Sequence, residues 1–412
     1  MYLEDFKIRN FKSCLKTDLT LNKEITSLIG INGSGKTNVL KAIASLAAVV
    51  TWGRNNPEAG ERNSIQTELQ GCLRDKNKKI KFSLDCSWQA TGRSEDIVVL
   101  KQTWDFSDYI PELGTVNFPL GWLYRFYANN EWDYLSYPNG LSKRQSLPAE
   151  VVEILGKEGK KLPFVKVINF LRDIKYYSAS QFVDPGKCPA SIELEDEKEV
   201  RRPLIGPSSH SSLIANMYRH FKDNTPAYEK FVFLIGPKTL NLIDEIDFKE
   251  FSIPSNKYEV ISAGRYKLIE ANRKIVIPEL KIDGKLLSLG QLSEGTFKTI
   301  SLLFYLLTDV SGMVLIEEPE VSIHRGLLAS ILEIIKTESK YKQIVISTHS
   351  EAVIDEMKPE WVRVVRRIPR KGTEVRTVDK MMSEKKYKIL KEYLGDRGNL
   401  GEYFKEGDFE NA

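Results

Sequence analysis

The chain has 412 residues, of which 42% are hydrophobic, enough to bury a large core and to form two or three structural units. Its 60 basic and 56 acidic residues leave a formal net charge of +4, so any nucleic-acid site has to be local. The four cysteines are scattered without a C-x-x-C pair, and no apolar run reaches the roughly eighteen residues of a membrane helix. We therefore expect a cytoplasmic protein with no secretion signal and no membrane contact.

The first motif along the chain is a glycine-rich loop, Gly30-Ile31-Asn32-Gly33-Ser34-Gly35-Lys36-Thr37, which fits G-x-x-x-x-G-K-[ST] at every position. An apolar run over 25–29 precedes it and a helical pattern over 39–43 follows it, a context that favours a phosphate-binding loop over a plain glycine turn. Lys36 is predicted to reach the β and γ phosphates of ATP, and Thr37 to hold Mg²⁺ through its hydroxyl. The predicted ATP-binding residues are Asn32, Gly33, Ser34, Gly35, Lys36 and Thr37.

The middle of the chain lacks sustained heptads and is interrupted by prolines and glycines, which argues against a coiled-coil arm. The ranges 78–88 and 96–104 are predicted to form two antiparallel strands. Helical spacing is found over 164–171, 212–221 and 228–234.

Three further strands are predicted over 257–261, 265–270 and 274–282. The residues Ile282-Asp283-Gly284-Lys285 then have the composition of a hairpin turn. These strands are expected to return the chain to the domain that holds the phosphate loop.

Paired acids end the next apolar strand, which covers 313–316. Such acids are common on protein surfaces, but after a phosphate-binding loop they are the groups that a Mg²⁺ site and an attacking water require. We predict that Glu317 serves the metal and that Glu318 orients or deprotonates the water.

A second apolar strand, over 343–346, leads to Ser347-Thr348-His349-Ser350. A lone histidine is usually structural, but at the end of a buried strand it can hydrogen-bond a γ-phosphate or the attacking water. His349 is therefore the second predicted catalytic residue.

A cationic ribbon follows, in a stretch that alternates like a hairpin around Lys371-Gly372. Its cations would neutralise phosphates and give sequence-independent DNA binding. The favoured alternative is a solvated edge hairpin that charge protects against aggregation. The five cations are Arg363, Arg366, Arg367, Arg370 and Lys371.

Together with Leu292-Ser293-Glu294-Gly295-Thr296, these motifs resemble the ABC-type ATPase heads of the SMC, RecF and OLD group. In that group the segment is the signature motif, which begins a helix that caps the γ-phosphate held by the other subunit. The apolar range 297–307 matches that helix. The resemblance implies a homodimer around ATP in which Ser293 and Gly295 contact the partner's nucleotide. Glu294 stands where the common pattern has glycine and places an acid near a phosphate.

The resemblance also assigns the remaining roles. Glu317 occupies a position that is usually aspartate, Glu318 matches the catalytic glutamate, and His349 matches the switch histidine. Gln181 is the candidate for the glutamine that senses Mg²⁺. The spelling of 317–324, Glu-Glu-Pro-Glu-x-x-Ile-His, is more like the OLD-related AAA-family ATPases of bacterial anti-phage defence than like RecF or the long-armed SMC proteins.

The expected fold class is α/β, an ABC-type P-loop NTPase head with an antiparallel β lobe and a mixed, mainly helical insertion. The first half of the head, with the phosphate loop and the β lobe, is assigned to 1–107 and the insertion to 108–255. The second half, with the signature, the paired acids and the switch histidine, is assigned to 256–412.

The expected function is that of a dimeric, SMC-like ATPase subunit that senses or scaffolds and controls a separate effector, a nuclease or toxin, in anti-phage defence. The alternative is a RecF-like repair or recombination ATPase that clamps DNA. About sixty residues follow His349, too few for the nuclease domain of OLD enzymes, so no nuclease activity of its own is expected.

Overall fold

The structure is a computed structural model of the whole chain. It describes residues 1–47, 65–91, 94–117, 133–136, 143–146, 163–178, 184–194, 210–261, 265–395 and 399–405. None of the helices in these ranges is long and apolar enough to cross a membrane.

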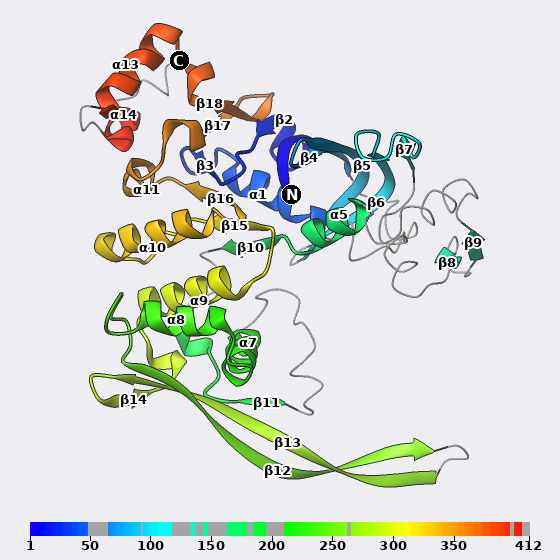
Figure 1. Cartoon of the computed structure of the whole chain (residues 1–412), viewed down its shortest axis with the longest axis vertical. Helices are drawn as coiled ribbons and strands as arrows, with labels where there is room; N and C mark the ends of the chain where they lie inside the picture. The colour runs from blue at the N-terminus through cyan, green and yellow to red at the C-terminus, as the bar shows by residue number, and fades with distance from the viewer. Residues whose placement is uncertain are drawn as a thin grey trace. The chain divides into compact units, whose positions relative to one another are not determined.

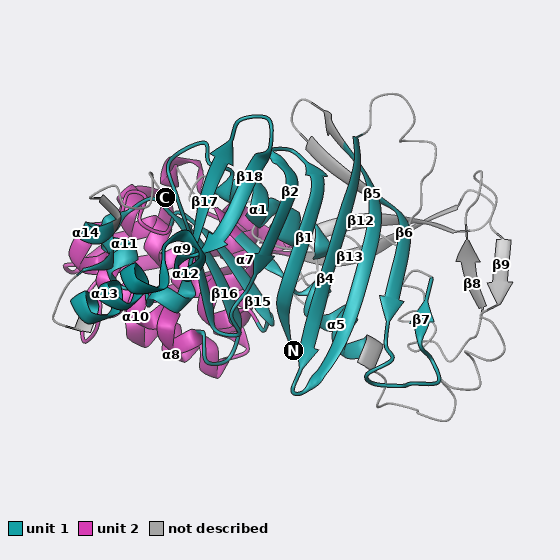
Figure 2. Cartoon of the chain, turned by 90° about the horizontal axis from the view of Figure 1, so that it is seen from above, with its two compact units in different colours: residues 1–176, 310–318, 339–412 teal, residues 177–309, 319–338 magenta. Residues whose placement is uncertain are grey.

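The chain divides into two compact units, and each is assembled from separate segments (Figure 2). Unit 1 consists of Met1–Tyr176, Val310–Glu318 and Ser339–Ala412, and unit 2 of Tyr177–Asp309 and Pro319–Glu338. These boundaries follow contacts within the folded chain, and the three consecutive ranges assigned from the motifs stay a prediction.

Unit 1 contains an antiparallel sheet with the strand order β2-β1-β4-β5-β6-β7. The strands predicted over 78–88 and 96–104 are confirmed as β5 and β6, which pair from Lys81 to Thr91 of β5 with one register shift. Gly92, in the turn predicted between them, lies outside the described residues. The strands are β1 (Tyr2–Phe11), β2 (Cys14–Thr20), β4 (Ile65–Asp75), β5 (Lys78–Thr91), β6 (Ser94–Asp105) and β7 (Thr115–Val116).

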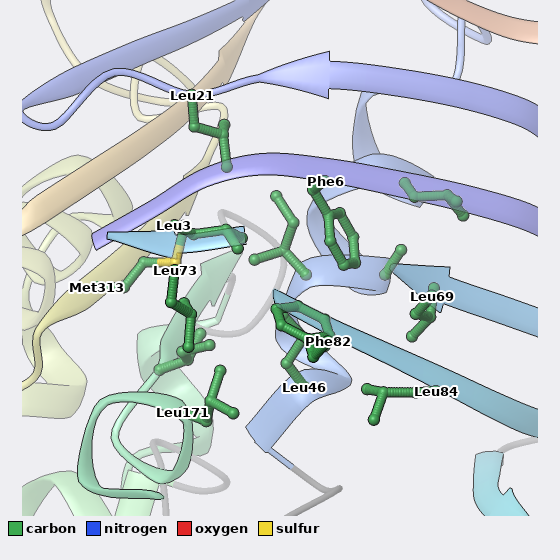
Figure 3. Close-up of a cluster of buried hydrophobic side chains, with 14 of the residues drawn as sticks. Leu3, Phe6, Leu21, Leu46, Leu69, Leu73, Phe82, Leu84, Leu171 and Met313 are labelled. Carbon is green, nitrogen blue, oxygen red and sulfur yellow. The ribbon is translucent and has the colours of Figure 1, made fainter. Parts of the chain in front are cut away.

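One face of this sheet carries the hydrophobic core of unit 1 (Figure 3). Leu3 and Phe6 are both fully buried although strand alternation would put them on opposite faces. A register shift against β4 between Leu3 and Asp5 resolves the conflict, since it adds one residue to β1. Phe6 and Phe82 then meet with ring centroids 6.5 Å apart. Burial of each such side chain is worth about 1.5–3 kcal/mol.

A second sheet has the order β10-β15-β16-β3-β17-β18 (Figure 1). The strands from β15 to β17 are parallel, and β18 pairs antiparallel with β17. Every residue of β3 is buried, and so is every residue of β16, as expected for central strands of a parallel sheet. The strands are β3 (Ile25–Ile29), β10 (Lys175–Ser178), β15 (Met313–Glu317), β16 (Gln343–Thr348), β17 (Val362–Ile368) and β18 (Gly372–Thr377).

The loops after β3, β15 and β16 leave the parallel sheet at its carboxyl edge, where ligands bind in open α/β sheets. The glycine-rich loop follows β3, Glu318 follows β15, and His349 follows β16. The sheet thereby gathers three of the predicted motifs at one edge.

The remaining elements of unit 1 are mostly helical. A two-stranded pair of β8 (Asp133–Ser136) and β9 (Lys143–Ser146) is the exception. The helices are α1 (Lys36–Ala44), α5 (Pro163–Arg172), α11 (Glu351–Asp355), η6 (Pro359–Trp361), α12 (Val378–Met381), α13 (Glu384–Gly395) and α14 (Leu400–Lys405).

Unit 2 combines helices with a long hairpin. The helices predicted over 212–221 and 228–234 are confirmed, and aromatic contacts hold the helices of this unit together, with the rings of Phe231 and Phe304 5.4 Å apart. The described elements are η4 (Pro185–Lys187), α7 (His210–Lys222), α8 (Pro226–Ile235), η5 (Leu289–Gln291), α9 (Glu294–Thr308), α10 (Arg325–Glu338) and strands β11 (Ile192–Leu194), β12 (Glu245–Ile261), β13 (Arg265–Ile282) and β14 (Lys285–Leu287).

The hairpin is longer than expected. The ranges predicted as separate strands, 265–270 and 274–282, form one continuous strand, β13, because each residue from Arg265 to Lys281 finds a register partner on β12. The hairpin turn predicted after Ile282 is confirmed, with Ile282 paired to Lys285.

Candidate functional site

The glycine-rich loop connects β3 to α1. Helix α1 begins at Lys36, and its N-cap Gly35 has φ +108°. Gly33 has φ +82°. L-residues rarely adopt such backbone angles, so the two glycines allow the chain to turn sharply between a buried strand and a helix. The amino end of α1 is thereby directed at the loop, as anion binding requires.

Two polar side chains of the loop are buried. Lys36 is 5% exposed, and its ammonium donates to the carbonyl oxygens of Gly30 at 2.7 Å and Ile31 at 3.1 Å. The hydroxyl of Ser34 is buried and has no hydrogen-bond partner among the described residues. A buried hydroxyl without a partner has lost its hydrogen bonds to water and gained none in return. A ligand with phosphate oxygens would supply the missing acceptor.

Ser13 and Thr373 support the loop through their hydroxyls, and of these two sequence reasoning missed Thr373. A Cβ added at Gly35 would lie 2.0 Å from Thr373 Oγ1 and 2.9 Å from Ser13 Oγ. These two hydroxyls hydrogen-bond each other at 2.7 Å, and Thr373 also donates to the carbonyl oxygen of Ser34 at 3.2 Å. Asn38 donates to Ser13 Oγ at 2.7 Å. Thr373 follows an ordinary hairpin turn, and no local pattern marks it as a support.

At the end of β15, the Glu317 carboxylate accepts hydrogen bonds from the hydroxyls of Thr37 and Tyr176. The structure thus brings together the two predicted metal-binding side chains, which lie far apart in sequence. Tyr176 is a further residue that the sequence did not mark. Gln181, the third predicted metal-binding residue, lies outside the described residues.

Glu318 and His349 also lie side by side. Glu318 has φ +48°, unusual for a residue other than glycine, and its backbone N–H donates to the Ser347 carbonyl oxygen at 2.8 Å. This bend turns its carboxylate to His349, whose Nδ1 lies 3.2 Å from Glu318 Oε1. Both side chains are open to solvent, so a water molecule and a phosphate can reach them.

The predicted signature residues belong to unit 2. Ser293 caps α9 by accepting a hydrogen bond from the Thr296 backbone N–H at 3.3 Å, and Gly295 lies in the first turn of this helix. The amino end of α9 therefore exposes N–H groups and a hydroxyl, the donors that a phosphate requires.

The cationic ribbon is a hairpin of β17 and β18, as expected, but Arg363 is not a surface cation. It is 5% exposed and donates to the carbonyl oxygens of Thr20, Glu360 and Val362 and to Asn22 Oδ1. These contacts connect β17 to the preceding segments of the chain, so Arg363 has a structural role. The prediction that all five cations of the ribbon are available to bind phosphates is therefore wrong for Arg363. Of the other four predicted cations, Arg366 is half-buried, and Arg367, Arg370 and Lys371 are exposed.

These features define an ABC-type P-loop ATPase head. They are the buried strand with its glycine-rich loop and helix, the acids after β15 and the histidine after β16. The chain belongs to the family described as "AAA domain, putative AbiEii toxin, Type IV TA system", whose model matches residues 106–355. A second model, described as "AAA domain", matches residues 6–158.

Curated relatives match over short stretches. The DNA replication and repair protein RecF of Arthrobacter sp. (strain FB24) is 47% identical over 49 residues, 12% of this chain. RecF of Streptococcus pneumoniae (strain CGSP14) is 28% identical over 123 residues, 29% of this chain. These stretches span 12% and 32% of the relatives' own lengths.

Solved structures of SMC heads match over most of the chain. An SMC head bound to the C-winged helix domain of ScpA has a TM-score of 0.48 at 14% identity and covers 92% of this chain and 99% of its own. The SMC head domain from Thermotoga maritima has a TM-score of 0.42 at 13% identity, covering 92% of this chain and 100% of its own.

Proposed function

We propose that the protein binds and hydrolyses ATP at the carboxyl edge of the parallel sheet. The observation that carries this proposal is the meeting of Thr37 with Glu317, and of Glu318 with His349, beside a phosphate-binding loop. Lys36 binds the β and γ phosphates, Glu318 orients and deprotonates the attacking water, and His349 contacts the γ-phosphate. Asn32, Gly33, Ser34 and Gly35 supply the loop around the phosphates.

The donor set fits Mg²⁺. Thr37 offers a hydroxyl and Glu317 a carboxylate, the hard oxygen ligands that this ion prefers, and the two already share a hydrogen bond. When bound, the ion neutralises charge on the phosphates. Gln181 is retained as a proposed third group, and Tyr176 orients the Glu317 carboxylate from its other oxygen.

The working form is a homodimer that encloses two ATP molecules. Ser293 and the Gly295 backbone of one copy bind the γ-phosphate held by Lys36 of the other, so ATP favours the closed dimer and hydrolysis opens it. The exposed donors at the amino end of α9 support this role.

The dimer controls a separate effector, a nuclease or toxin, in anti-phage defence. The family description, which names a toxin of a toxin–antitoxin system, supports this context. The protein itself supplies the ATP-driven change of state and acts in the cytoplasm.

Two variants test the ATPase. Lys36→Ala should abolish ATP binding, because it removes the buried cation of the loop. Glu318→Gln should retain ATP binding and lower turnover at least about 100-fold, because only activation of the water is lost. Equilibrium binding of a fluorescent ATP analogue and phosphate release measure the two effects. Normal turnover by Glu318→Gln would remove Glu318 from its assigned role.

The effector is tested with the ATP-locked form. Glu318→Gln protein is affinity-purified from its native cells with ATP, and proteins that accompany it are identified by mass spectrometry, with Lys36→Ala as the matched control. We expect a nuclease or toxin with Glu318→Gln and not with Lys36→Ala. Equal recovery with both variants would contradict ATP-dependent control.

A second candidate is a RecF-like clamp on DNA, favoured by the 47% identity to RecF over 49 residues. It predicts that the Glu318→Gln dimer binds DNA with ATP and without another protein. Replacing the exposed Arg367, Arg370 and Lys371 with alanine should then weaken binding and reduce its salt dependence.

A further inference from the structure

The acid that replaces the usual glycine of the signature segment is held in a defined network within unit 2. Glu294 Oε1 lies 2.8 Å from Lys298 Nζ, one helical turn further along α9, and accepts a hydrogen bond from Ser322 Oγ at 2.8 Å. These partners stabilise the carboxylate, and the hydrogen bond from Lys298 is the first cause of a lowered pKa at Glu294. The acid is therefore charged and already compensated.

Lys298 is buried, with 7% of its side chain exposed. Besides Glu294, its ammonium lies within 3.4 Å of Ser322 Oγ. A buried ammonium is costly unless an anion is next to it, so Glu294 stabilises the Lys298 ammonium in this position. Lys298 in turn cancels the negative charge that Glu294 adds to the first turn of α9.

Ser322 belongs to the segment that follows the paired acids. Its φ is +64°, and its carbonyl oxygen approaches α9 so closely that a Cβ added at Gly295 would lie 2.3 Å from it. Ser322 thus contacts the signature helix through its side chain, at Glu294, and through its backbone, at Gly295. Backbone strain of this kind persists only where surrounding contacts hold it.

We infer that Glu294, Lys298 and Ser322 form a positioning unit that balances charge at the signature turn and ties it to the segment after the catalytic glutamate. The inference rests on the proposed function, because it takes the amino end of α9 as the site of the partner's γ-phosphate. Within that site, the positive charge of Lys298 offsets the negative charge of Glu294, which would otherwise repel the phosphate. Ser322 makes the segment after Glu318 move with α9.

The two charged members then act in opposite directions on ATP-driven dimerisation. Glu294→Gln keeps an oxygen acceptor for Ser322 but leaves the Lys298 cation uncompensated, so an arriving phosphate is bound more tightly. Lys298→Met leaves the Glu294 anion uncompensated, so the same phosphate is repelled. A purely structural pair would weaken dimerisation in both variants.

The dimer dissociation constant is measured by sedimentation with ATP and Mg²⁺ in the Glu318→Gln background, where hydrolysis is suppressed. We expect the dissociation constant to fall about fivefold with Glu294→Gln and to rise about fivefold or more with Lys298→Met. These magnitudes are those expected when one charge close to a phosphate is removed at a partly solvated site. Raising the salt concentration should reduce both shifts. Glu333→Gln is the matched control, because it breaks a Glu–Lys pair of similar length, 2.7 Å, on α10, away from the signature turn.

Ser322→Ala tests the positioning part in the hydrolysing protein. It leaves both charges in place, so the Michaelis constant for ATP should stay within about twofold while kcat falls roughly tenfold. Ser322→Asn, which restores a hydrogen-bond donor and tolerates the positive φ of this position, should recover part of kcat.

The outcomes distinguish a failure of the proposed ATP-dependent dimer from a failure of the positioning unit. If the Glu318→Gln parent forms no ATP-dependent dimer, the proposed function fails before the positioning unit is tested by dimerisation, and the Ser322 series then decides the inference. If the parent dimerises and the Glu294 and Lys298 variants shift in the same direction, or not at all, the inference is overturned.

Discussion

At the residue scale, Gly33 and Gly35 of the phosphate loop have different constraints, and this difference can be measured. Gly33 and Gly35 both have left-handed backbone angles, but a Cβ at Gly33 meets nothing within 4 Å, whereas one at Gly35 would overlap Thr373. Gly33→Ala should therefore cost about 1 kcal/mol of unfolding free energy, and Gly35→Ala about 3 kcal/mol. Urea denaturation of the two variants checks this. Equal losses of unfolding free energy in the two variants would show that Thr373 moves aside without destabilising the protein.

Sequence reasoning located the chemistry of the site better than its supports. Lys36, Thr37, Glu317, Glu318 and His349 carry motif signals, and the structure gathers them at one edge of unit 1. Their assigned roles in ATP chemistry stay predictions.

The contacts of the supporting residues could not be predicted, because they are long-range. Ser13 and Thr373 are 360 positions apart and meet only in the folded chain. Tyr176 reaches Glu317 in the same manner, across 141 positions. A local pattern contains no signal for such pairs.

At the scale of elements, the hairpin of β17 and β18 has one buried cation that holds it and several exposed ones that do not. Arg363→Met should lower the unfolding free energy by about 2–4 kcal/mol, because the carbonyl oxygens of Thr20 and Glu360 lose a charged donor. Arg367→Met, on the same strand, is exposed and should change it by less than about 0.5 kcal/mol. Thermal or urea unfolding measures both, and similar losses would contradict the division of roles.

The extent of the elements was predicted less well than their type. Alternation in sequence marks a strand but not its length, and β13 continues through 271–273 because β12 offers a partner at each position. The buried arginine escaped for a related reason. The four residues 362–365 are all buried, so both faces of β17 are covered around Arg363, and only the fold determines this.

At the scale of the whole molecule, the cysteines report on the two units separately. Cys14, Cys72 and Cys86 belong to unit 1, Cys188 belongs to unit 2, and all four are buried free thiols. Thiol labelling followed by mass spectrometry should find them protected in the native protein. With increasing urea, the three thiols of unit 1 should become reactive together. Separate midpoints among those three would contradict a single cooperative unit 1.

Cys86 also links stability to alkaline pH. Burial raises the pKa of its thiol from 9.0 to about 12, so the folded chain retains a proton that the unfolded chain loses above pH 9. Its contribution is fully present below pH 9 and is lost as the pH rises toward 12. Unfolding midpoints in urea near pH 8 and near pH 10.5 should therefore differ less in Cys86→Ala than in the parent. An unchanged difference would assign the pH effect to other groups.

The pairing of β3 between β16 and β17 has a consequence for how the protein is made. On the ribosome, β3 emerges long before both of its neighbours; the hydrogen bond from the Leu3 backbone to Gln343, for example, spans 340 positions. An apolar strand followed by a glycine-rich loop is therefore without its sheet partners while the intervening residues are translated. The nascent chain is expected to depend on chaperones over that interval, because the nucleotide site is completed only after β16 has been synthesised.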